Sequence, residues 1–389
     1  MMKRWFCLLL LLFMLLQMLC ACQGTPHANS SADDLDSCAQ TSGYRMAETK
    51  DGFYLSIWNR LYYADKADLT NWVPLCSEPR CDHTQSICIS RMAYEEFYIK
   101  GERIYTIRHL DALDQINAAQ GQAVVSTKLD GSDIRVEFEL EGSSTRGEGY
   151  INAILTPECA YGQYYEMQND GHFKATVVRA NEDGTEILFE QSLEALTGLQ
   201  YFESANTWYG MRGNFCLLSA VAAKDESGSF TSEKKLFQSV GSGLEEISGI
   251  EGLNRYGAYW DGNTMYYKSA DGYYRFDSAT ALSKKYLDAN SRNATGYYLE
   301  PDHIIETNYN SDVPGSDAVM AVYHEGEWNE ITIPEELLTM QEGSFSPLSL
   351  SADGMFFTVF DFQTAMYHLY RIPLDGNTNT AILCGSFSA

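Results

Sequence analysis

Short stretches of alternating apolar and polar residues fill most of the chain after residue 44. GFYLSIW from residue 52, RIYTIRH from residue 103 and GMFFTVF from residue 354 are examples. A period of two places successive side chains on opposite faces of a β-strand. Turn residues separate these stretches, and Asp-Gly dipeptides begin at Asp51, Asp130, Asp183, Asp261, Asp271, Asp353 and Asp375. Because glycine tolerates positive φ, Asp-Gly favours tight hairpins. The pattern predicts an all-β fold.

A unit of strand, turn and strand recurs seven times along residues 44–389. One turn position marks each unit: Gly52, Gly101, Gly162, Gly213, Gly262, Asp302 and Gly354. The intervals between these markers run from 40 to 61 residues, which is the length of a four-stranded blade. A single sheet of this size cannot bury both of its faces, so the repeat predicts sheets that stack radially. We therefore predict that residues 44–389 form a β-propeller of seven blades, with six or eight blades as the alternatives.

The first 21 residues have the features of a secretion signal. Lys3 and Arg4 precede an apolar run over residues 5–19, which is too short for a comfortable membrane span. The segment ends in Leu-Cys-Ala-Cys, which resembles the lipobox of bacterial lipoproteins, where the final cysteine is lipidated and becomes the first residue. By that resemblance, residues 1–21 are a lipoprotein signal peptide and Cys22 is the lipidation site. An ordinary secretory signal and an uncleaved signal anchor are the alternatives.

Residues 22–43 are small and polar, without the apolar period of a helix or strand. This composition predicts a flexible, lipidated tether. About twenty such residues span about 25 Å, which is enough to lift a folded domain off a lipid surface. The expected location is the outer face of the cell membrane, with the membrane as a partner through the lipid anchor.

The chain is strongly acidic, with a formal net charge of −26 at pH 7. Removal of the first 21 residues leaves 25 basic against 53 acidic residues. Binding to nucleic acid needs clustered lysine and arginine to contact the phosphates. The charge balance therefore argues against nucleic acid as a partner. It indicates a highly soluble surface, with capture of cations or cationic ligands as the alternative.

A second resemblance covers residues 46–88, MAETKDGFYLSIWNRLYYADKADLTNWVPLCSEPRCDHTQSIC. A glycine-aromatic strand and a tyrosine-rich strand lead into P-L-C, a proline turn, C-x-H and a further cysteine. This order resembles the opening of a family of β-propeller lipoproteins from Gram-positive bacteria. LSLSADGMFF, at residues 348–357, is similar to the strand starts of TolB-like and WD40-like propeller repeats, with Ala352 where a proline is usual. These resemblances imply a fold and a location, and they imply no reaction.

Cysteine and histidine are concentrated in one loop of the sequence. Cys76, Cys81, His83 and Cys88 follow the spacing C-x4-C-x-H-x4-C. Three thiolates and one imidazole form a ligand set that suits tetrahedral zinc, and Pro79 offers a turn that folds the loop back on itself. In an extended segment, Cys81 and His83 point the same way. These four residues are therefore the predicted metal ligands, with zinc as the expected cofactor.

A disulfide among Cys76, Cys81 and Cys88 is the alternative to a metal, since disulfides form readily outside the cell. Seven cysteines follow Cys22 in the sequence: Cys38, Cys76, Cys81, Cys88, Cys159, Cys216 and Cys384. An odd number leaves at least one thiol unpaired within a monomer. Free loop thiols beside His83, which can be redox-active, are the third alternative. NWVPLC is the predicted outer strand of the first blade, so the loop connects that blade with the second.

The sequence contains no G-x-S-x-G, H-E-x-x-H, P-loop or G-x-G-x-x-G pattern, and no catalytic residue is predicted. The favoured function is a ligand-binding or scaffold lipoprotein for a protein, peptide or glycan. The first alternative is a metal- or redox-linked sensor or accessory lipoprotein that uses the Cys/His loop. The second is an extracellular glycan hydrolase or lyase, because a catalytic pair can be hidden among so many carboxylates.

Overall fold

A computed structural model describes residues 45–83, 88–93, 96–109, 122–140, 152–155, 159–167, 173–192, 211–212, 215–224, 230–240, 243–248, 250, 258–261, 264–269, 271–290, 296–299, 304–307, 319–324, 326–332, 343–351, 354–373 and 381–388. The predicted signal peptide, Cys22 and the predicted tether lie outside these residues. The described residues form 28 β-strands and no helix. They therefore include no helix long and apolar enough to cross a membrane. The predicted all-β class is confirmed.

The described strands form seven four-stranded antiparallel sheets, each made of four consecutive strands. The first three sheets comprise β1 (Met46–Glu48), β2 (Gly52–Ile57), β3 (Arg60–Asp65) and β4 (Val73–Pro74); β5 (Phe97–Lys100), β6 (Arg103–His109), β7 (Gln122–Lys128) and β8 (Arg135–Leu140); and β9 (Asn152–Leu155), β10 (Ala160–Met167), β11 (Phe173–Asn181) and β12 (Gly184–Ser192).

The fourth and fifth sheets comprise β13 (Met211–Arg212), β14 (Phe215–Lys224), β15 (Phe230–Val240) and β16 (Gly243–Glu246); and β17 (Ala258–Asp261), β18 (Thr264–Ser269), β19 (Gly272–Asp277) and β20 (Leu282–Asp288). The sixth and seventh comprise β21 (Gly296–Leu299), β22 (Ile304–Thr307), β23 (Val319–His324) and β24 (Glu327–Thr332); and β25 (Gly343–Ser351), β26 (Gly354–Asp361), β27 (Met366–Ile372) and β28 (Ile382–Ser388). Each predicted sequence unit lies within one sheet, while the markers Gly213, Gly262 and Asp302 lie outside the described residues.

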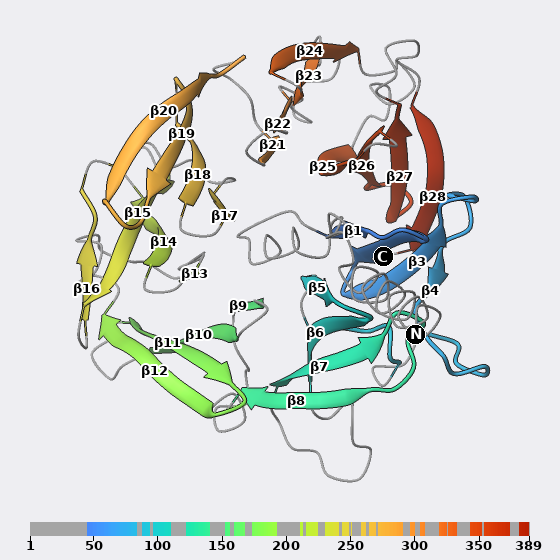
Figure 1. Ribbon diagram of the computed structural model, residues 1–389, viewed down its shortest axis with the longest axis horizontal. Coiled ribbons are helices and arrows are strands. Elements are labelled where there is room, and N and C mark those ends of the chain that lie inside the picture. Colours follow the sequence, from blue (N-terminus) through green and yellow to red (C-terminus); the bar gives the residue numbers. More distant parts are fainter. Residues whose placement is uncertain are drawn as a thin grey trace, which may run out of the picture.

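The sheets follow one another around a common centre (Figure 1). In each sheet the first strand in sequence lies towards the centre and the fourth lies at the periphery (Figure 1). The connection between consecutive sheets therefore runs from a peripheral strand to a central one. The last sheet lies beside the first, with β25 to β28 next to β1 to β4 (Figure 1).

Apolar side chains pack between neighbouring sheets, because each sheet buries its faces only against its neighbours. The clusters that join two described sheets include Tyr54, Leu61, Phe97 and Ile104 between the first and second; Ile107, Val124, Leu155 and Val178 between the second and third; and Phe53, Leu55, Phe356 and Leu369 between the last and the first. The ring centroids of Phe53 and Phe356 are 5.1 Å apart. The two ends of the β-rich chain are thus held together by side-chain packing.

Glycine begins strands β2 and β19 for a steric reason. A Cβ atom on Gly52 would lie 2.3 Å from the carbonyl oxygen of Ala64, and one on Gly272 would lie 2.4 Å from the carbonyl oxygen of Leu287. Neither glycine has a positive φ. The Asp-Gly interpretation is therefore correct for Gly131, where φ is 77°, but wrong for Gly52 and Gly272, where the close approach of the adjacent strand excludes a side chain.

A buried ion pair joins the fifth and sixth sheets. Lys268 on β18 and Glu306 on β22 are 2% and 1% exposed, and Nζ lies 3.4 Å from Oε1. The hydroxyl of Tyr273 on β19 donates a hydrogen bond of 2.7 Å to the same Oε1. The ammonium group also lies 5.8 Å from the centroid of the Tyr273 ring, within cation–π range. The carboxylate therefore has two partners from the neighbouring sheet.

Candidate functional site

The cysteine loop connects β4, at the periphery of the first sheet, with β5, the central strand of the second (Figure 1). This is the place that the sequence predicted for it. The structure describes residues 75–83 and 88–93 of the connection, whereas residues 84–87 lie outside the described part. Its two described arms lie against the first sheet, and both carry predicted ligands.

Backbone hydrogen bonds fix both arms of the loop. The amide of Leu61 on β3 donates to the carbonyl of Ser90 at 2.8 Å, which holds the second arm against the sheet. In the first arm, the amide of Cys81 donates to the carbonyl of Glu78 at 3.1 Å and closes a turn. His83 then has a φ of 60°, a left-handed conformation that histidine adopts more often than most residues. These local constraints position the ligands of both arms.

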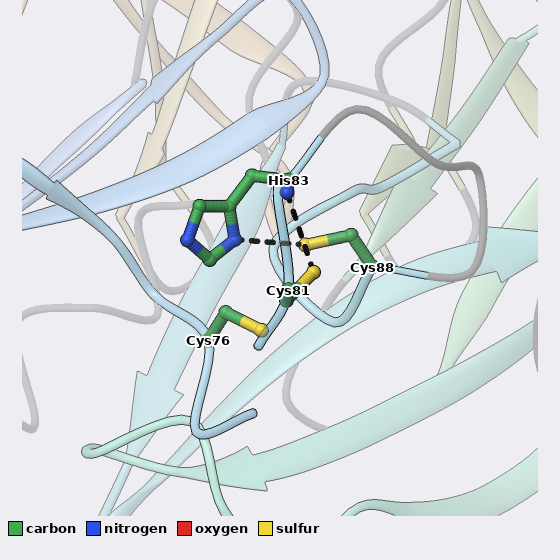
Figure 2. Close-up of side chains that lie close together, drawn as sticks. All are labelled: Cys76, Cys81, His83 and Cys88. Carbon is green, nitrogen blue, oxygen red and sulfur yellow. Dashed lines mark hydrogen bonds between the residues drawn. The ribbon is translucent and has the colours of Figure 1, made fainter. Parts of the chain in front are cut away.

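The four predicted ligands converge on one point. Figure 2 shows the sulfur atoms of Cys76, Cys81 and Cys88 and the imidazole of His83 turned towards one another. Their ligand atoms all lie within 4.8 Å of one another, and Nδ1 of His83 is 3.4 Å from Sγ of Cys88. Metal–ligand bonds of about 2.0 to 2.3 Å imply about 3.5 Å between a nitrogen and a sulfur ligand of a tetrahedral ion. The cluster can therefore hold a metal ion with little rearrangement.

The environment of the cluster favours the thiolate form of Cys88. Burial opposes ionisation of this thiol, but hydrogen bonds from Ser90 and His83 outweigh burial and hold the pKa of Cys88 below its usual value. Oγ of Ser90 lies 3.1 Å from Sγ of Cys88. Burial raises the pKa of Cys76, so this thiol keeps its proton at neutral pH until a cation displaces it. The environment therefore favours ionisation of Cys88 and disfavours ionisation of Cys76.

The described residues include five cysteines that form no disulfide: Cys76, Cys81, Cys88, Cys159 and Cys384. Cys88 is buried, while Cys76, Cys81 and His83 are partly exposed. The donor set of three sulfur atoms and one nitrogen matches the chemistry that soft or borderline cations prefer. The structure brings together the four residues that the sequence predicted as metal ligands.

Two residues beside the cluster were not predicted as part of the site. Ser90 contacts the Cys88 sulfur, and Arg108 on β6 donates a hydrogen bond to the carbonyl of Cys88. The sequence does contain a signal for Arg108. It continues the alternation of Ile104 and Thr106, which are both buried, so the period of two places an arginine on the inward face of the strand.

An exposed aromatic patch lies where the first and last sheets meet. The patch consists of Trp58, Phe360, Phe362 and Tyr367. Its rings form a continuous chain, with centroid distances of 6.0 Å from Trp58 to Tyr367, 4.6 Å from Tyr367 to Phe360 and 4.9 Å from Phe360 to Phe362. Trp58 is 49% exposed and Phe362 is 56% exposed. The patch therefore exposes the rings of Trp58 and Phe362 to solvent, while Phe360 and Tyr367 are partly buried.

Trp58 adopts a conformation that is unfavourable for its side chain. It has a φ of 53° in the turn between β2 and β3. Left-handed backbone costs about 1–2 kcal/mol for a residue with a Cβ atom, and it is a rare conformation for a bulky residue. Half of the indole also stays in water. Neither feature stabilises the fold, and strain of this kind is concentrated at sites of function.

No protein-family model matches the sequence, and no curated protein matches it. Several solved structures match the chain at low sequence identity and with TM-scores below 0.5. An acylaminoacyl peptidase from Pyrococcus horikoshii is 11% identical, with a TM-score of 0.44 over 90% of this chain and 53% of the peptidase. TolB from Acinetobacter baumannii is 16% identical, with a TM-score of 0.33 over 85% of this chain and 76% of TolB.

The CNH domain of AfRom2 is 6% identical, with a TM-score of 0.38 over 82% of this chain and 91% of that domain. The present chain spans about half the length of the acylaminoacyl peptidase chains that it matches. Similarity at this level says nothing about activity, so the candidate function depends on the residues described above.

Proposed function

We propose that this chain is a membrane-anchored, extracytoplasmic β-propeller of seven blades that acts as a binding or scaffold lipoprotein for another protein. Seven consecutive four-stranded sheets around a common centre support the propeller, as does the packing of the last sheet against the first. The lipobox-like sequence before Cys22 supports the anchor, and the resemblance of residues 46–88 supports a place in the Gram-positive lipoprotein family.

The observation that carries the binding function is the aromatic patch with the strained Trp58 at its edge. Exposed apolar patches on soluble proteins mark sites of association. Tryptophan and tyrosine supply much of the binding energy at protein interfaces, and phenylalanine is enriched there as well. The indole of Trp58 packs against the ring of Tyr367, and 49% of the residue remains exposed, so the exposed part is available for contact with a partner.

A photocrosslinking amino acid at position 362 is expected to capture the partner in cells that produce the protein. The same probe at Leu282, which is 68% exposed on β20, is the matched control for an exposed apolar position outside the patch. Replacing Trp58 with asparagine relieves the left-handed strain and should weaken capture at position 362 at least tenfold without lowering the melting temperature by more than a few degrees. Equal adducts from positions 362 and 282, or none from either, would contradict the proposed binding surface.

We also propose that the metal at the loop is zinc and that its role is structural. Four protein ligands leave no open position for substrate, as in structural zinc sites. The connection between the first two sheets contains few apolar residues, so a metal that joins its two arms would fix it where burial cannot. Cys76 and Cys81 come from the first arm together with His83, while Cys88 comes from the second.

Replacing Cys22 with serine is expected to release the protein from the membrane or to leave it unprocessed. A diacylglyceryl group holds a protein firmly because each buried methylene contributes about 0.8 kcal/mol, and serine cannot form the thioether. Labelled fatty acid should enter the wild-type chain and be absent from the variant. Cys38→Ser is the control, because Cys38 lies in the predicted tether and should leave labelling unchanged. Label in the Cys22→Ser chain would exclude this lipidation site.

A further inference from the structure

Arg108 is a buried cation beside the cysteine cluster. Its side chain is 2% exposed, and Nη2 donates a hydrogen bond to the carbonyl oxygen of Cys88. Its Nε and Nη1 atoms are buried and have no hydrogen-bond partner among the described residues. The described part of this acidic chain gives Arg108 no ion pair with a carboxylate. Two of its donors therefore face the interior without an acceptor.

A guanidinium group in this position needs a negative charge near it, because arginine keeps its proton and an uncompensated buried charge is strongly unfavourable. The carbonyl group that Nη2 contacts belongs to Cys88, whose sulfur is part of the cysteine cluster. The cluster is therefore the group beside Arg108 that can carry a compensating negative charge.

The charge of the cluster depends on what it holds. Two of the three cysteines joined in a disulfide, with the third protonated, have no net charge, and three thiols without a metal have one only to the extent that Cys88 is ionised. A divalent zinc ion with three thiolates and a neutral imidazole has a net charge of −1, which matches the single positive charge of Arg108. We propose that Arg108 is the built-in counter-charge of an anionic zinc–trithiolate centre and makes the loop selective for that centre. This inference rests on the zinc centre proposed above.

If the role of Arg108 were purely structural, its effect on zinc affinity would not depend on the charge of the ligand set. The hydrogen bond to the carbonyl of Cys88 holds the backbone of the second arm, and that role depends on the donor and on packing. A counter-charge depends on the charge of the ligand set. Changing that charge independently of Arg108 therefore separates the two roles, as in a double-mutant cycle.

The test measures the zinc dissociation constant of the full-length chain by competition with a chelator at one fixed pH. Wild type, Arg108→Met and Arg108→Lys are compared, and each is repeated with Cys76→His, which converts the ligand set to a neutral Cys2His2 centre. Arg108→Met should weaken zinc binding about 10- to 100-fold, the usual effect of removing a group next to a metal's ligands. Arg108→Lys, which keeps the charge, should stay within a few-fold of wild type.

With Cys76→His in place, Arg108→Met should change zinc affinity less than threefold, because the neutral centre needs no counter-charge. Cobalt substituted for zinc should give the same sulfur-to-metal charge-transfer bands in wild type and Arg108→Met, which shows that all three thiolates still bind.

The counter-charge role would be overturned if Arg108→Met and Arg108→Lys lost equal amounts of zinc affinity. It would also be overturned if Arg108→Met lost as much affinity with Cys76→His in place as without it. If Arg108→Met does not fold, Arg108→Gln keeps a donor for the Cys88 carbonyl without charge and takes its place. A wild-type chain that binds no zinc refutes the zinc centre, and the counter-charge role with it.

Discussion

Replacing Cys88 with serine is expected to abolish zinc retention and to lower the melting temperature by several degrees. Cys88 is the buried member of the cluster, at 2% exposed, and it is the ligand that the second arm contributes. A metal at a thousandfold excess over its dissociation constant stabilises the folded state by about 4 kcal/mol, and this contribution disappears with the site. The wild-type chain should contain one zinc per molecule by elemental analysis, and the variant should contain almost none.

Cys384→Ser is the matched control for this substitution. Cys384 on β28 is also a buried free cysteine, at 3% exposed, but it belongs to the core between the last and first sheets. Its replacement removes the same sulfur atom without touching the loop, so zinc content should remain at one per chain. A wild-type protein without zinc, or a Cys88→Ser variant that keeps it, would contradict the metal centre.

Replacing Glu306 with glutamine is expected to destabilise the protein by about 3–5 kcal/mol, because removal of one partner leaves the other buried charge uncompensated. Lys268 would keep its place among apolar and aromatic groups of the fifth and sixth sheets, where Tyr273 contacts it through its ring. Chemical denaturation at pH 7 measures the loss. Adding Lys268→Met to Glu306→Gln should restore much of it, since the double variant buries no charge.

The loss of stability in Glu306→Gln should become smaller as the pH rises. Burial lowers the pKa of Lys268, while the charge of Glu306 raises it. Without Glu306 the folded-state pKa of Lys268 falls further below the unfolded value, so the unfolded state binds more protons than the folded state at every pH between these two values. The stability of Glu306→Gln should therefore rise from pH 7 to pH 10 relative to wild type. Glu186→Gln, which removes the partner of Arg179 in an exposed pair, should change stability little at either pH.

The sequence predicted the features of this protein that depend on neighbouring residues. Alternation of apolar and polar positions and recurring turn residues are local signals, and they led to the all-β class and to units that each fall within one sheet. The convergence of the four predicted metal ligands follows for the same reason. Cys76 to Cys88 lie within thirteen positions, so their convergence requires only a turn in one loop.

Features that depend on distant residues were not predicted. The pair of Lys268 and Glu306 joins strands that are far apart in sequence, and among so many carboxylates nothing in the local pattern distinguishes Glu306. Arg108 reaches the cluster only because β6 lies beside the loop in the folded chain. Trp58 shares the two-residue turn between β2 and β3 with Asn59, whose φ is 56°. Asparagine is typical of such turns, but nothing in the sequence marks the tryptophan itself as left-handed.

Packing of the last sheet against the first, without a strand shared between them, has a consequence for biosynthesis. Phe53 and Leu55 are synthesised long before the residues that cover them, which include Phe356 and Leu369. Until those residues follow, the face of the first sheet must stay in contact with water or with a helper protein. A chain that stopped before β25 would leave that face permanently uncovered and accessible to proteases that recognise exposed apolar segments.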